Sequence, residues 1–293
     1  MIRIGISGWT YPRWRGVFYP KGFPHSRELE FASRRFRSIE INGTFYRLQR
    51  PHNFAQWRDE TPEDFVFAVK GSRYVTHMLK LSNVETALAS FFASGIFRLG
   101  RKLGPILWQF SPRLKFDPER FESFLGMLPR DTTEALKLAR KHDARVAGRA
   151  WLKVEFAQAL RHAFEIRHES FCVPEFIALL SRRGAALVCA DTVDWPLLMD
   201  VTADFVYCRL HGSEELYASG YEDRALDGWA RRVRAWARGG EPKDADRVAP
   251  TASPAPNGRD VFVYFDNDVK VRAPADAAAL AARLELGQAK QSR

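Results

Sequence analysis

The stretch from His162 to Phe171 reads H-A-F-E-I-R-H-E-S-F and has the alternation of a β-strand. Phe164 and Ile166 are expected on one face, with Glu165 and Arg167 on the other. The stretch is one of eight similar runs, and helical segments separate most of them. In a closed barrel the second face of a strand points into the lumen, where a charge costs several kcal/mol unless it is paired or functional. Glu165 and Arg167 are therefore the first candidate functional residues.

The spacing of the runs predicts the fold class. Eight strand–helix units in succession favour a (β/α)8 TIM barrel, and 293 residues suffice for one such α/β domain. A doubly wound open sheet is the alternative, but the first strand, I-R-I-G-I-S-G, lacks the G-x-G-x-x-G turn of nucleotide-binding sheets. We expect a single domain over residues 1–293, with a strand-rich core in 2–286. Gly, Pro, Ala and Ser predict a flexible linker at 239–259, and the tail at 287–293 is expected to be frayed.

The composition excludes several classes of protein. Hydrophobic residues make up 46% of the chain and charged residues 27%, which excludes wholesale disorder. No apolar run approaches the roughly 20 residues of a membrane span, and the chain starts directly in a strand instead of a secretory leader. Of the three cysteines, Cys189 and Cys208 lie inside predicted strands and are expected to be buried, reduced thiols. These features predict a cytoplasmic protein with no membrane partner.

The charge balance points to anionic partners. The net charge is +10 and the pI about 9.7, which favours phosphorylated metabolites, RNA or DNA. The alternative is a scattered basic surface without a partner, because the chain has no basic run of five or more and no basic–aromatic repeat. The sequence leaves the cofactor and the oligomeric state open.

Polar side chains gather at the predicted strand ends, where the active sites of TIM barrels lie. Seven of the eight strand ends carry at least one. The candidate catalytic residues are Glu165, Glu40, His211 and Asp191. The candidate substrate-binding residues are Lys70, Arg167, Arg209, Asn42, Gln109, Tyr46, Trp9, Asn267 and Asp268. The structural alternative is that Glu165 pairs with Arg167 or Arg209 and braces the barrel mouth.

Two chemistries fit these groups. In the first, Arg167, Arg209 and Lys70 hold a phosphate or carboxylate, Glu165 or Glu40 is the general base, and His211 is the acid. In the second, Glu40, Glu165, Asp191 and His211 bind divalent metals that activate water for phosphoester hydrolysis. The second is weaker, because the chain has no H-x-x-x-H, H-x-H or C-x-x-C spacing, and we assign no metal ligands.

Two further functions stay open. A glycosidase-like hydrolase would use Glu40 and Glu165, and it needs the two carboxylates about 5 to 9 Å apart. A barrel that binds nucleic acid or a metabolite without catalysis is the alternative to an enzyme. Our leading expectation is an enzyme that acts on an anionic, phosphate-bearing substrate by acid–base chemistry or, as a hydrolase, by hydrolytic chemistry.

Seven ordered motifs resemble the YecE-like family, also described as domain of unknown function 72. They are G-I-S-G-W-x-Y-x-x-W-R-G-V-F-Y-P, E-I-N-G-T-F-Y-R-L, F-A-V-K-x-x-R-Y-V-T-H, L-G-P-I-L-W-Q-F, F-E-I-R-H-E-S-F, V-Y-C-R-L-H-G and V-Y-F-D-N-D. The resemblance runs from Ile4 to about Leu284 and implies a TIM-barrel fold without naming a reaction. One departure is local: the family's F-N-N-D is F-D-N-D here, which adds Asp266.

Overall fold

The eight predicted strands close into one parallel barrel. The computed structural model describes residues 1–212 and 214–286, and its strands pair in sequence order until β8 meets β1. The strands are β1 Ile2–Ser7, β2 Ser38–Ile41, β3 Val66–Lys70, β4 Leu103–Gln109, β5 His162–Glu165, β6 Ala186–Asp191, β7 Phe205–Leu210 and β8 Asp260–Phe265. This topology confirms the predicted (β/α)8 TIM barrel.

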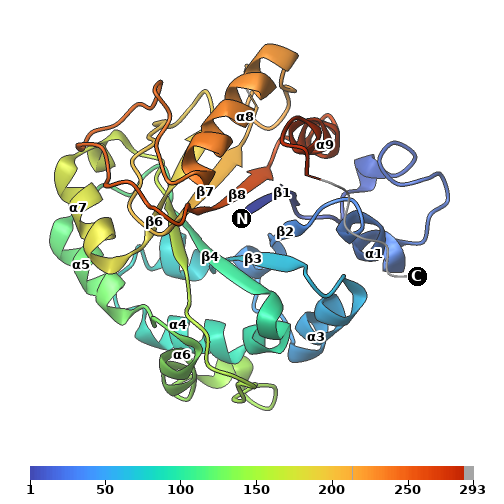
Figure 1. The fold of residues 1–293 in the computed structure, drawn as a ribbon. Coiled ribbons are helices and arrows are strands. Elements are labelled where there is room, and N and C mark those ends of the chain that lie inside the picture. Colours follow the sequence, from blue (N-terminus) through green and yellow to red (C-terminus); the bar gives the residue numbers. More distant parts are fainter. Residues whose placement is uncertain (213, 287–293) are drawn as a thin grey trace.

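Helices surround the barrel as an outer ring (Figure 1). They are α1 Glu28–Ser33, α2 Gly43–Tyr46, α3 Pro51–Glu60, α4 Glu85–Ala93, α5 Pro118–Met127, α6 Thr132–Ala139, α7 Pro174–Arg183, α8 Asp223–Ala237 and α9 Ala273–Arg283. Side-chain caps begin two of them, α5 and α6. Asp117 stands just before Pro118, the first residue of α5. Its side chain accepts a hydrogen bond from the backbone N–H of Arg120.

Strand alternation sorts the side chains into two buried clusters. Outward residues such as Phe164 and Ile166 join the large cluster between the strands and the helices, as predicted. A separate cluster fills the lumen and includes Leu107, Tyr207 and Phe262. Because both faces of these parallel strands are covered, apolar residues occupy both. Inward polar residues are concentrated at the carboxyl ends of the strands, so this end of the barrel holds the candidate site.

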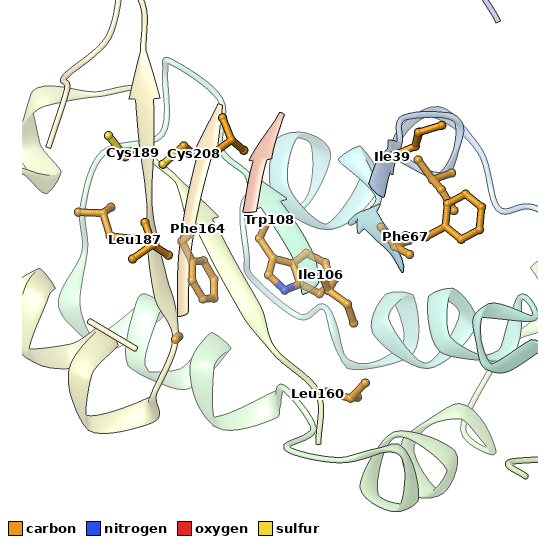
Figure 2. Close-up of a cluster of buried hydrophobic side chains, with 14 of the residues drawn as sticks. Ile39, Phe67, Ile106, Trp108, Leu160, Phe164, Leu187, Cys189 and Cys208 are labelled. Atoms are coloured by element: carbon orange, nitrogen blue, oxygen red, sulfur yellow. The ribbon is translucent and has the colours of Figure 1, made fainter. Parts of the chain in front are cut away.

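Trp108 of β4 belongs to the outer cluster (Figure 2), and His162 stands on the neighbouring strand β5. Trp108 is fully buried against Phe91 and Phe124, with ring centroids 5.6 Å away in each case. Its Nε1 donates to His162 Nδ1 over 3.1 Å, and His162 Nε2 lies 2.8 Å from the carbonyl oxygen of Pro129. The imidazole is therefore held in its neutral form, and burial lowers the pKa of His162 to about 4.

Residues 239–259 are a packed loop, which corrects the flexible linker predicted there. The Arg259 guanidinium donates to the carbonyl oxygens of Gly239, Gly240 and Ser253 at 2.6, 3.0 and 2.8 Å. Gly239 has φ 84°, and a Cβ there would lie 1.9 Å from the Ala255 oxygen, so the turn requires glycine. Glycine and proline serve a compact turn in this segment. The predicted frayed tail, 287–293, lies outside the described residues.

Two other expectations concern the thiols and the membrane. Cys189 and Cys208 are free and buried on neighbouring strands β6 and β7, as predicted. Within residues 1–212 and 214–286, no helix has the length and apolar character that would let it cross a membrane.

The state of His162 predicts a loss of stability in acid. Its pKa is 6.5 as a free side chain and about 4 in the fold, so between these pH values the unfolded chain binds more protons. The free energy of unfolding should therefore fall by about 3 kcal/mol as the pH drops from about 6.5 to about 4. In His162→Gln, which cannot titrate, urea denaturation should show a pH dependence that is smaller by this amount. An unchanged pH dependence would contradict the assignment.

Candidate functional site

Arg209 lies at the centre of the polar end of the barrel. It stands near the end of β7 and is completely buried. Its Nη2 lies 2.9 Å from Glu40 Oε1 and 2.6 Å from Asp266 Oδ2, and its Nη1 lies 2.5 Å from Glu165 Oε2. Its Nε donates to Glu40 Oε2 at 3.1 Å. One guanidinium thus joins carboxylates from β2, β5 and the end of β8, and we call these four residues the Arg209 cluster.

The two glutamates of the cluster have no free carboxylate oxygen. Glu40 also accepts hydrogen bonds from Ser7 Oγ and, at 2.5 Å, from the hydroxyl of Tyr207. Glu165 Oε1 lies 2.7 Å from Arg167 Nε and 2.6 Å from its Nη2. Burial alone would raise the pKa of Glu165, but Arg209 and Arg167 hold it well below its usual range. This geometry favours the structural ion pair over a catalytic Glu165.

The same contacts weigh against the glycosidase hypothesis. Such an enzyme needs two carboxylates that face the sugar from opposite sides. Glu40 and Glu165 instead face a guanidinium that bridges them, and both are completely buried.

Two more predicted catalytic residues, His211 and Asp191, are occupied by contacts with other side chains. His211 is completely buried, with Nδ1 3.3 Å from Asp266 Oδ2 and its ring edge-on to Trp195 and Tyr217. His211 thus packs against the Arg209 cluster through Asp266. Asp191, also predicted to be catalytic, accepts a hydrogen bond of 3.0 Å from Trp229 Nε1 of α8, outside the barrel.

The four residues of the weaker metal hypothesis do not converge on one point. Glu40 and Glu165 are held by Arg209, and Asp191 points to a helix on the opposite face of its strand. In the part of the chain that the structure describes, no group of three or more His, Cys, Asp or Glu side chains is placed to hold a metal ion.

A cavity of about 830 Å³ opens beside the cluster at the carboxyl ends of the strands. Seven predicted binding residues line it: Trp9, Asn42, Tyr46, Lys70, Gln109, Arg167 and Asp268. Its remaining wall is rich in aromatic rings, which include Tyr11, Phe45, Trp57 and Tyr217. The structure therefore brings most of the predicted binding residues together in one concave site.

Two predicted binding residues do not reach this cavity. Arg209 lies in the closed cluster, where Ser7 Oγ and Gln109 Oε1 accept further hydrogen bonds from it at 3.2 and 3.4 Å. Asn267 is completely buried, and its Nδ2 donates to the Ser219 carbonyl and to Asp276 Oδ2 at 2.9 and 2.8 Å. Both residues thus position the site from outside it.

Lys70 is the unusual cation of the cavity. Its side chain is buried at the end of β3, and its ammonium lies 4.6 Å from the centroid of the Phe45 ring. No ion pair or hydrogen bond of this ammonium occurs among residues 1–212 and 214–286. Burial, with the nearby charge of Arg209, lowers the pKa of Lys70 to about 8.

Asp268 lines the cavity and has the opposite shift. Burial and the neighbouring charge of Asp266 raise the pKa of Asp268 to about 6. Two titratable groups of one cavity are thus both shifted toward neutral pH.

Sequence reasoning missed Asp266 and Tyr217 as parts of the site. Alternation could have found Asp266, because it stands two residues after the inward Tyr264 and is the local departure in F-D-N-D. Tyr217 lies in a loop after β7 and receives a hydrogen bond of 3.2 Å from Arg167 Nη2. No strand pattern marks a loop residue of this kind.

Loss of the Arg209 guanidinium should destabilise the barrel strongly. Arg209→Met leaves three carboxylates buried side by side, and we expect the free energy of unfolding to fall by about 3–5 kcal/mol at pH 8. The loss should shrink toward pH 5, because the crowded carboxyls can then bind protons. Arg232→Met, at a partly exposed pair with Asp244, should cost less than about 1 kcal/mol. Equal losses in the two variants would refute the central role of Arg209.

Two curated proteins are similar to part of this chain in sequence. The chain is 30% identical to the UPF0759 protein YecE of Escherichia coli K12 over 91 residues, 31% of each chain. It is 32% identical to the UPF0759 protein YunF of Bacillus subtilis over 117 residues, 38% of this chain and 40% of that relative. The matches thus span less than half of the length of either curated relative.

Solved structures match over nearly the whole chain. A DUF72 family protein from Thermotoga maritima has a TM-score of 0.72 at 23% identity, over 97% of this chain and 99% of that one. Another from Enterococcus faecalis has a TM-score of 0.67 at 16% identity, over the full length of both. These likenesses concern the fold alone. The family model described as protein of unknown function DUF72 matches residues 3–293, and the chain belongs to that family.

Proposed function

We propose that the protein is an enzyme that acts on a small anionic substrate by acid–base chemistry in the 830 Å³ cavity. The observation that carries the proposal is Lys70, a buried ammonium that faces this cavity and forms no ion pair in the described chain. A buried charge without a partner is costly unless a ligand completes its environment. A carboxylate or phosphate of the substrate would do so.

Two further donors support an anion at this place. Arg167 uses Nε and Nη2 for Glu165 and Tyr217, which leaves Nη1 available beside the cavity. Gln109 turns its Oε1 to Arg209, which leaves its amide N–H groups available. Arginine and amide donors of this kind bind carboxylate and phosphate oxygens through charge-assisted hydrogen bonds. Arg209, which the sequence placed among these donors, is replaced in the proposal by Gln109.

The proposed acid–base groups are Asp268 and Lys70. A general acid or base works best when its pKa lies near the working pH, and these groups have pKa values of about 6 and about 8. They replace Glu165 and His211 in the roles that the sequence suggested. Asp266 would orient the substrate, because it lines the cavity while Arg209 keeps it ionised.

The cavity favours a small molecule over nucleic acid. Its volume lies within the range of about 300–1,000 Å³ that is usual for small-molecule sites. The non-catalytic, nucleic-acid-binding alternative rests on the net charge of +10. A cytoplasmic location is also part of the proposal, and the free thiols Cys189 and Cys208 support it.

Arg167 should govern anion affinity. In Arg167→Gln, calorimetric titration should show inorganic phosphate bound at least about tenfold more weakly, because a charge-assisted hydrogen bond is lost. Arg167→Lys should retain part of the affinity. Arg183→Gln, at the end of α7 and outside the lining of the cavity, should bind as the wild type does.

Unchanged phosphate affinity in Arg167→Gln would contradict the proposal. Binding of RNA or DNA with a steep salt dependence that ignores Arg167 would favour the nucleic-acid alternative.

The ionised carboxylate of Asp268 should destabilise the fold at neutral pH, because burial and the charge of Asp266 disfavour it. Such a cost is typical of a functional carboxyl. Its pKa is 3.8 as a free side chain and about 6 in the fold, so the folded state binds more protons between these values. Its cost appears above pH 3.8 and is complete above pH 6. Asp268→Asn should therefore raise the free energy of unfolding by about 1–2 kcal/mol at pH 7.5, after discount for solvent screening, and by little at pH 4. Equal effects of the substitution at both pH values would show that Asp268 is not shifted.

A further inference from the structure

The surroundings of Lys70 resemble those of a nucleophilic amine more than those of a lysine that only neutralises nearby carboxylates. Its neighbours at the mouth, Asp266 and Glu165, are already bound to Arg209 at 2.6 and 2.5 Å. Its own ammonium contacts the face of the Phe45 ring, and its backbone oxygen is fixed by Thr44 Oγ1 at 2.6 Å. The strand end is thus held firmly while the amine faces the cavity.

Two features of this environment favour the neutral amine. Burial against an aromatic ring removes water from the ammonium, and the positive Arg209 lies nearby. Lysines that are desolvated or placed next to a second cation are the ones that attack carbonyl carbons as free amines. With a pKa of about 8, a useful fraction of Lys70 is neutral at physiological pH.

A second lysine of the chain shows what such burial does without a cavity. Lys102 is half buried, and burial lowers its pKa, as it does for the more deeply buried Lys70. Its ammonium, however, is bound by the carbonyl oxygens of Arg58 and Thr61, at 2.5 and 2.8 Å. Lys102 therefore has a structural role, and Lys70 differs from it in its free amine and its access to a cavity.

We propose that Lys70 forms a Schiff base with a small aldehyde or ketone that also carries a carboxylate or phosphate. This inference rests on the proposed function, since Arg167 and Gln109 would hold the anionic group while Lys70 reacts with the carbonyl. It makes the substrate class a carbonyl compound, such as a 2-oxo acid or a sugar phosphate in its open form.

The step is balanced by groups that line the cavity. Neutral Nζ adds to the carbonyl carbon, a C–N bond forms, and the nitrogen proton passes to the oxygen to give a carbinolamine. Protonated Asp268 then donates a proton to the hydroxyl, the C–O bond breaks, and water leaves. The products are a positively charged iminium on Lys70 and a carboxylate on Asp268, with no oxidant or reductant required. The Phe45 ring would face this cation, as it faces the ammonium.

Borohydride trapping tests the inference directly. The protein is incubated at pH 7 with pyruvate, with dihydroxyacetone phosphate, or with uncharged acetone, and sodium cyanoborohydride reduces any imine to a stable amine. Intact-mass and peptide mass spectrometry then locate the adduct. We expect one reduced adduct per chain, on Lys70, that forms at least tenfold faster with the two anionic carbonyls than with acetone.

Matched variants separate the outcomes. Lys70→Met should abolish the adduct, Lys70→Arg should do so while it keeps the charge and the fold, and Lys102→Met should leave trapping unchanged. Labelling spread over surface lysines and unaffected by Lys70→Arg would overturn the inference.

The test also distinguishes this inference from the proposed function. If phosphate binding depends on Arg167 but no carbonyl labels Lys70, the Schiff base is wrong and the anion site stands. If acetone labels Lys70 as fast as pyruvate does, and Arg167→Gln changes neither rate, the amine is reactive but the anion site is wrong.

Discussion

The guanidinium of Arg209 is the contact on which the mouth of this barrel depends. It is completely buried and bound to Glu40, Glu165 and Asp266, which come from three different strands or strand ends. Carboxylates grouped in a low-dielectric lumen would repel one another, so the fold can hold them there only with this cation between them. The planar fork of arginine, with five N–H donors, satisfies several oxygens at once in a way that the single ammonium of lysine does not.

This closed cluster determines where chemistry can occur. The two glutamates that would be the obvious acid and base are paired on every oxygen and lie out of the cavity. In the proposed function, substrate binding and acid–base chemistry therefore fall to Lys70, Arg167 and Asp268, which line the cavity and are less completely paired. The cluster supports them electrostatically: the charge of Arg209 contributes to the low pKa of Lys70, and that of Asp266 to the high pKa of Asp268. In the proposed function, the charges of the buried cluster thus shift the pKa values of the groups that line the cavity.

The period of two along a strand made much of this predictable. It placed Phe164 and Ile166 outward and Tyr207 and Arg209 inward, and the structure agrees. The same rule could have removed Asp191, which shares the outer face of β6 with Cys189, had alternation been weighed above position at a strand end.

The partners of Arg209 could not be predicted, because they depend on how the eight strands close into a barrel. Glu40 and Glu165 lie 125 residues apart in the chain, and only the stagger of eight strands brings both to one guanidinium. Strand alternation gives the face of each side chain but not its height in the barrel. For the same reason the sequence could not show that Lys70 would be left without a carboxylate.

A crystal structure of the protein grown with inorganic phosphate would test the central claim most directly. Phosphate should lie in the cavity, within about 2.7–3.2 Å of Lys70 Nζ and Arg167 Nη1. The contacts of the Arg209 cluster should be unchanged. Phosphate found only on the outer surface would contradict the account. So would a Lys70 ammonium that turns to Asp266 and makes no contact with the phosphate.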